Sequence, residues 1–169
     1  GKAALRGVGG TRNCDWWFTD QAVLLDTAGR YTTQDSDAAA DGAAWSEFLG
    51  LLRKYRGRRP INGVILAISA QDLMTQGSSA REAHVAAARR RLDELNRELR
   101  MSLPVYLIVT KCDLVSGFTE YFDDQTQQAR AQVWGVTFPY EQTLKGDAAQ
   151  TFPVEFDGLI ARLNERLTA

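Results

Sequence analysis

Cysteine, histidine and long apolar runs are scarce in this sequence, and each absence excludes a class of protein. The two cysteines, Cys14 and Cys112, show no metal-ligand spacing and cannot build a disulfide framework, so a reducing compartment fits better than an extracellular one. The single histidine, His84, lies in a stretch rich in alanine and arginine and is expected to be structural. No apolar run approaches the roughly 20 residues of a membrane helix, and the chain opens without a signal-peptide pattern.

A surplus of either charge is absent as well. The 169 residues include 20 Lys and Arg against 21 Asp and Glu, which gives a net charge of −1. This balance provides no electrostatic case for binding nucleic acid or an anionic membrane surface. Hydrophobic residues make up 44% and charged residues 24%, which is typical of a globular domain and not of a disordered chain. The length fits one compact domain over residues 1–169.

Apolar runs alternate with stretches of helical periodicity along the chain. Two β-prone runs, residues 13–18 and 22–26, are separated by a polar turn and predict a hairpin. The nearly continuous apolar runs 62–69 and 104–110 are typical of strands that are buried on both faces. The remaining predicted elements are helices over 43–56, 79–100, 118–131 and 153–167 and a strand over 132–138. This alternation predicts an α/β fold with a mostly parallel sheet flanked by helices.

The run DTAGR, residues 26–30, directly follows the second strand of the hairpin. Parallel sheets bind ligands at the carboxyl ends of their strands, so polar loops there are candidate sites. Asp26 can hold Mg²⁺, usually through a water molecule. Gly29 lets the backbone approach a terminal phosphate closely. The alternative is an ordinary Asp/Gly turn with no ligand.

The run TKCD, residues 110–113, follows the strand over 104–110. The carboxylate of Asp113 can accept hydrogen bonds from N1–H and from the exocyclic amine of guanine, whereas adenine offers it no matching donors. The stem of Lys111 can lie along the base, beside Thr110. The alternative is a solvated surface loop. The two runs together, at strand ends and in this order, are typical of GTPase-like domains.

Thr11 closes a glycine-rich stretch just before the hairpin, the place at which a GTPase-like fold has a threonine that binds Mg²⁺ and the terminal phosphate. The alternative is a flexible linker. No G-x-x-x-x-G-K-[ST] occurs in the sequence, and Gly1-Lys2 is followed by alanines. The sequence therefore predicts a P-loop GTPase-like fold whose phosphate-cradling loop, first strand and first helix lie upstream.

Long idiosyncratic runs of this sequence resemble the TssM/IcmF family, the large inner-membrane subunit of the bacterial type VI secretion system. The resemblance covers nearly the whole chain and rests on GGTRNCDWWFTDQAVLLDTAGRYTTQDSD (9–37), W-x-x-FLGLLRKYR (45–56), RRPINGVILAIS (58–69), PVYLIVTKCDLVSGFTEYF (104–122) and QVWGVTFP (132–139). It implies that the segment is a cytoplasmic NTPase-like domain of a protein anchored in the inner membrane. Partners implied are TssL in the membrane and TssK of the baseplate, with Mg²⁺ and GTP or ATP as cofactors.

The resemblance places the family's nucleotide-binding positions on Thr110, Lys111, Asp113 and Gly29, and its Mg²⁺ positions on Thr11 and Asp26. No catalytic residue is evident, because Arg30 stands where Ras-like enzymes have the glutamine that orients water. Two functions stay open for the parent protein, a slow GTPase or ATPase and an inactive nucleotide-fold scaffold. The chain by itself is expected to be inactive. A neighbouring segment or a second chain is expected to cover apolar sheet surface left by the missing strand.

Overall fold

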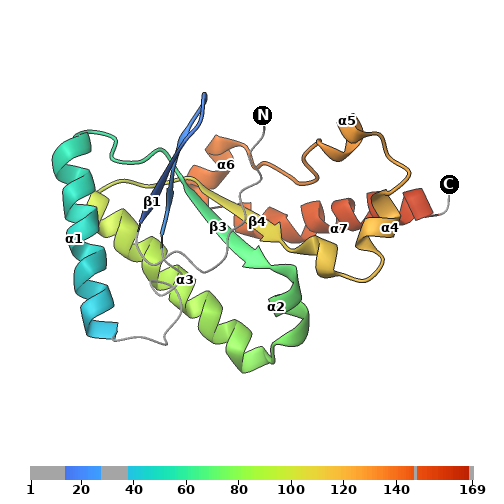
Figure 1. The fold of residues 1–169 in the computed structure, drawn as a ribbon, viewed down its shortest axis with the longest axis horizontal. Helices are drawn as coiled ribbons and strands as arrows, with labels where there is room; N and C mark the ends of the chain where they lie inside the picture. Colours follow the sequence, from blue (N-terminus) through green and yellow to red (C-terminus); the bar gives the residue numbers. More distant parts are fainter. Residues whose placement is uncertain (1–13, 28–37, 147, 168–169) are drawn as a thin grey trace. The chain divides into compact units, whose positions relative to one another are not determined.

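The fold is described from a computed structural model, which describes residues 14–27, 38–146 and 148–167. The chain forms two compact units, Gly1–Thr119 and Glu120–Ala169. The first unit holds the strands and two long helices, α1 and α3, and the second holds a further long helix, α7 (Figure 1). The prediction of a single domain over 1–169 stays a prediction.

The first unit contains two sheets of two strands each. Strands β1 (Asp15–Phe18) and β2 (Val23–Asp26) pair antiparallel, which confirms the predicted hairpin. Strands β3 (Val64–Ser69) and β4 (Val105–Thr110) pair in parallel and in register. A parallel pair needs a long crossover, and helices α2 (Ala70–Thr75) and α3 (Ser78–Leu99) supply it. The single, mostly parallel sheet of a GTPase-like fold stays a prediction.

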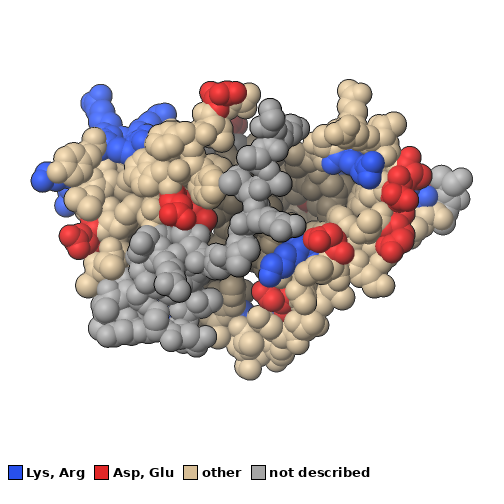
Figure 2. Space-filling model, viewed as in Figure 1, with Lys and Arg blue, Asp and Glu red and all other residues tan. Residues whose placement is uncertain are grey.

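The core of the first unit lies between α3 and α1 (Ala38–Arg56). The buried side chains of this core are Trp45, Leu49, Leu52, Leu95, Leu99 and Leu103. Leu25 of β2 and Val64 of β3 pack against the same cluster, so one helical layer holds both sheets. Lys and Arg side chains gather over the C-terminal end of α1, at the upper left of the space-filling view (Figure 2).

Strand β4 keeps both of its faces accessible. Tyr106 and Ile108, which point to one face, are 56% and 44% exposed, and Leu107 on the other face is 53% exposed. The sequence predicts this run as a strand buried on both faces, and the prediction is wrong for the chain as described. Exposed apolar surface of this kind is typical of a site at which another segment or chain packs.

The second unit is helical. It contains α5 (Gln127–Arg130), α6 (Tyr140–Lys145) and α7 (Ala148–Leu167), and α4 (Phe118–Phe122) crosses the boundary between the units. The Tyr121 hydroxyl donates a 2.9 Å hydrogen bond to the carbonyl of Leu163, and the Arg166 guanidinium lies 4.9 Å from the Tyr121 ring centroid. Arg166 also pairs with Asp124, so one cluster joins the α4 region to α7.

Two predicted elements differ from the structure. The helix predicted over 118–131 is split into α4 and α5, because Thr126 caps a new helix by accepting a hydrogen bond from the Ala129 N–H. Residues 132–138 form no strand, although their composition is β-prone. Val133 is 95% exposed, and no described strand lies beside this segment to pair with it.

No helix within the described ranges combines the length and the apolar character that crossing a bilayer requires.

Candidate functional site

The carboxyl ends of β3 and β4 lie side by side. Ser69 and Thr110, the last residues of the two strands, are register partners. The Ser69 hydroxyl caps α2 by accepting a 3.2 Å hydrogen bond from the Asp72 N–H. The Thr110 hydroxyl donates a 3.3 Å hydrogen bond to the carbonyl of Ile68, across the strand pair. Both hydroxyls therefore stabilise the strand ends from which the candidate loop departs.

Lys111 is the residue at which the loop changes direction. Its φ of 56° and ψ of 32° lie in the left-handed region, which costs a non-glycine residue about 1–2 kcal/mol. Its carbonyl accepts a 3.1 Å hydrogen bond from the Leu114 N–H and so starts the short helix η2 (Cys112–Leu114). Such a conformation is retained where the surrounding loop requires it, and it is more common at functional sites than elsewhere.

Asp113 lies within η2 and its side chain is exposed. Helix η2 packs beside α2, so the chains that leave β3 and β4 meet at one edge of the sheet. The structure thus brings Thr110, Lys111 and Asp113 together with Ser69 at that edge. An exposed carboxylate beside an exposed lysine can bind a base that offers two N–H donors.

Asp26 lies at the end of the other sheet, where it is the register partner of Asp15. Facing residues of an antiparallel pair share one side of the sheet, so the two carboxylates lie near each other. Burial raises the pKa of the neighbouring Cys14 thiol, and the charges of Asp15 and Asp26 raise it further. The donor set fits Mg²⁺ in type, because carboxylate oxygens are ligands that this cation prefers.

Sequence reasoning missed Asp15. The turn predicted over residues 19–21 would set Asp15 opposite Leu25, whereas the structure has a four-residue turn that pairs Phe18 with Val23 and sets Asp15 opposite Asp26. Thr11 and Gly29 lie outside the described residues, as does Arg30. The common rim of Asp26 and Asp113 stays a prediction. Within the described residues, no group of three or more carboxylate, histidine and cysteine side chains forms a ready-made metal centre.

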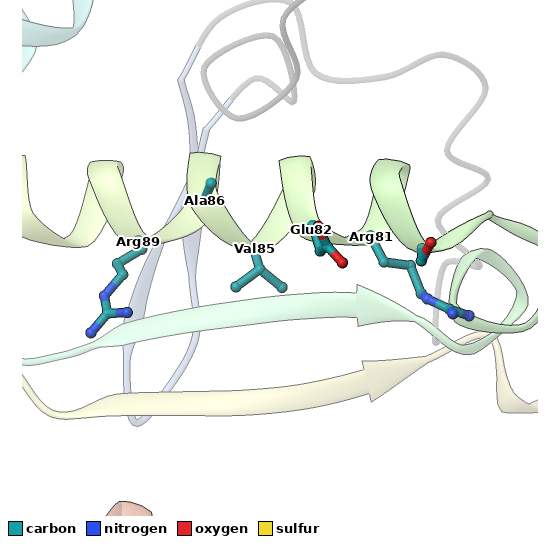
Figure 3. Close-up of a pocket in the computed structure, with 6 residues that line it drawn as sticks. Arg81, Glu82, Val85, Ala86 and Arg89 are labelled. Carbon is teal, nitrogen blue, oxygen red and sulfur yellow. The ribbon is translucent and has the colours of Figure 1, made fainter.

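Two hollows lie beside the first half of α3. The smaller, of about 50 Å³, lies at the carboxyl end of β3 and is lined by Ile68, Ser69, Asp72, Leu73, Gln76, Arg81, His84 and Val85. The larger, of about 440 Å³, continues along α3, where Arg81, Val85 and Arg89 point to one side of the helix (Figure 3). Its volume suits a ligand, but it lies away from Lys111 and Asp113 and only α3 lines it. The larger hollow therefore contains none of the candidate residues of the loop edge.

The comparisons with known proteins give one consistent result. The family model of the IcmF-related N-terminal domain matches residues 38–169. A curated relative, the type VI secretion system component TssM1 of Pseudomonas aeruginosa, is 54% identical over all 169 residues. The chain spans 15% of the length of that relative. No solved structure matches the chain.

Proposed function

The chain belongs to the family of IcmF-related N-terminal domains, and from this premise we propose that it is the nucleotide-binding domain of a type VI secretion component. The similarity to TssM1 supports the role in secretion. The observation that carries the nucleotide assignment is the loop edge, where Lys111 takes a left-handed conformation beside the exposed Asp113. In the proposed protein this domain lies on the cytoplasmic face of the inner membrane and works with TssL and TssK.

Each residue has a distinct part in the proposed binding. Asp113 accepts two hydrogen bonds from guanine, and the aliphatic stem of Lys111 covers the face of the base. Asp26, through water, and the hydroxyl of Thr11 would hold Mg²⁺, and the backbone N–H groups of Gly29 and Thr11 would donate to the terminal phosphate. Mg²⁺, when bound, neutralises charge on the phosphates. Thr110 acts indirectly, because its hydroxyl bonds to Ile68 and fixes the strand end.

Binding without rapid turnover is the expected behaviour. Arg30 stands where Ras-like enzymes have the glutamine that orients the attacking water, and a guanidinium offers no acceptor for a hydrogen bond from that water. The proposed domain therefore hydrolyses its nucleotide slowly or with help from a partner. Slow hydrolysis suits a domain that controls assembly of the secretion apparatus better than one that turns over nucleotide continuously.

The proposed fold needs a further strand that carries the phosphate-cradling loop, and β3 offers an edge for it. The Val64 N–H donates a 2.9 Å hydrogen bond to the Pro104 carbonyl. The backbone groups of Val64, and of every second residue after it in β3, therefore point toward β4. The backbone groups of Ile65 and Ala67 then face the other edge, where no described strand pairs. Residues of the longer protein outside these 169 supply this strand in the proposal.

The test is calorimetry of GTP binding to the full-length protein with and without Mg²⁺. Asp26→Ala is expected to weaken Mg²⁺-dependent binding by about 10- to 100-fold, the usual loss for a group that orients a metal's ligands. Asp20→Ala is the matched control, because Asp20 lies in the turn at the opposite end of the same hairpin. Equal affinities for the two variants would remove Asp26 from the metal site.

A second function is favoured by the exposed apolar strands. A nucleotide fold retained as a docking scaffold would use such surface to hold partners, with or without nucleotide. In that case Asp26→Ala leaves secretion and the capture of TssL and TssK intact. Loss of both in this variant would exclude the scaffold function.

A further inference from the structure

Positive charge is concentrated in one part of the chain. Residues 48–71 contain five basic residues and no acidic residue, so the remaining residues carry a net charge of −6 when the whole chain carries −1. The five are Arg53, Lys54, Arg56, Arg58 and Arg59, which we call the basic end of α1. An overall balance of charge therefore hides a strongly cationic surface, visible over the end of α1 (Figure 2).

Helix stability explains only part of this concentration. Arg53, Lys54 and Arg56 lie in the last turn of α1, where cations interact favourably with the helix dipole. Arg58 and Arg59 lie beyond the helix end, after Gly57 turns the chain with a φ of 59°. All five side chains are exposed, and none forms a salt bridge with a described residue.

Apolar side chains are also exposed on the last two turns of α1. Tyr55 is 74% exposed and Leu51, one turn earlier, is 47% exposed. The Lys54 ammonium lies 5.2 Å from the centroid of the Tyr55 ring. Tyrosine with neighbouring lysine and arginine is the composition found at the headgroup level of bilayers.

The arrangement fits a flat anionic surface better than a peptide or a nucleic acid. Successive helical residues are rotated by about 100°, so Arg53, Lys54 and Arg56 spread over roughly 160° of the helix circumference, which is wider than the stripe that one partner helix covers. Single-stranded nucleic acid requires a groove bordered by stacking aromatics. The two hollows beside α3 are lined by neither the basic end of α1 nor any tyrosine, tryptophan or phenylalanine. We propose that the basic end of α1 binds the surface of a bilayer that contains anionic phospholipids, with Tyr55 and Leu51 at the level of the headgroups.

The test is sedimentation of the chain with vesicles of phosphatidylcholine alone and with one quarter phosphatidylglycerol. Binding is expected only with the anionic vesicles, and it is lost at about 1 M salt, where the Debye length falls to about 3 Å. Arg58→Gln with Arg59→Gln is expected to weaken binding roughly 30-fold, because each basic residue near such a surface contributes a factor of roughly five to the affinity. These two residues lie outside α1, so the substitution leaves the helix end intact.

Arg89→Gln with Arg90→Gln is the matched control, an exposed pair on α3 with the same change in net charge. Its binding to anionic vesicles is expected to stay within about threefold of the unmodified chain, because charge remote from the surface is screened. Equal losses for the two pairs, or equal binding to neutral vesicles, would overturn the proposal. Binding of polyglutamate or an oligonucleotide without sedimentation on anionic vesicles would overturn it as well.

Discussion

At the scale of single residues, the candidate site depends on backbone conformation as much as on side-chain type. Two described residues other than glycine have a positive φ, Arg100 and Lys111, and they have different settings. Arg100 follows the last residue of α3 and terminates that helix, which is an ordinary place for a left-handed residue. Lys111 directly follows a strand and turns the chain into the candidate loop. This difference separates the structural use of the conformation at Arg100 from the functional use that we propose for Lys111.

Replacing each of these residues by glycine tests that separation. Lys111→Gly and Arg100→Gly are both expected to change the free energy of unfolding by less than about 1 kcal/mol, because relief of strain offsets the entropy of glycine. Only Lys111→Gly is expected to weaken the binding of GTP, by roughly 4- to 15-fold, because one or two methylene contacts with the base are lost. Thermal unfolding and calorimetry measure the two effects. Equal GTP affinity in both variants would contradict a contact between Lys111 and the base.

The reactivity of the Cys14 thiol depends on the charge of the neighbouring Asp26. Because the carboxylates of Asp15 and Asp26 raise the pKa of the Cys14 thiol, removing one of them lowers it and increases the thiolate fraction near pH 8. Asp26→Asn is therefore expected to speed the alkylation of Cys14, followed by mass spectrometry with Cys112 as the internal reference. Asp20→Asn serves as the control. An unchanged rate in Asp26→Asn would contradict the electrostatic contact.

At the scale of elements, the sequence predicted secondary structure that has a local signal, such as a turn. It did not predict features that depend on a partner strand elsewhere in the chain. The turn after Phe18 predicted the hairpin, and Thr19 closes it by accepting a 2.9 Å hydrogen bond from the Ala22 N–H. Helix α2 was missed although Ser69 and Asp72 have the spacing of a capping box. The predicted strand over 132–138 was wrong because composition does not supply a pairing partner. Strand ends were predictable, whereas the pairing of Asp15 with Asp26 needed the register.

The cluster around Tyr121 tests the coherence of the second unit. Tyr121→Phe removes the 2.9 Å hydrogen bond to the Leu163 carbonyl and keeps the ring against Arg166. The free energy of unfolding of this unit is expected to fall by about 1 kcal/mol. Tyr55→Phe, at a 74% exposed position, is the control and should change it by less than about 0.5 kcal/mol. Hydrogen exchange of α7 amides measures both, and equal exchange in the two variants would contradict a stabilising role for the bond.

At the scale of the whole molecule, the chain corresponds to a small part of its TssM1 relative. It spans 15% of its TssM1 relative, and its exposed strands and the edge of β3 are surfaces that other segments can complete. In the proposed protein, nucleotide state at the loop edge and lipid contact at the basic end of α1 are separate interactions of the first unit. They can be removed independently, because the residues that carry them do not overlap.

The central claim is that Asp113 recognises guanine, and calorimetry of the full-length protein with Mg²⁺ and three nucleotides tests it most directly. The unmodified protein should prefer GTP to ATP by about 10-fold or more, since each charge-assisted hydrogen bond contributes about 1.5–3 kcal/mol. Asp113→Asn should lose this preference and bind xanthosine triphosphate more tightly than GTP, because the amide donates where the carboxylate accepted. Equal affinity of the unmodified protein for ATP and GTP would contradict the claim.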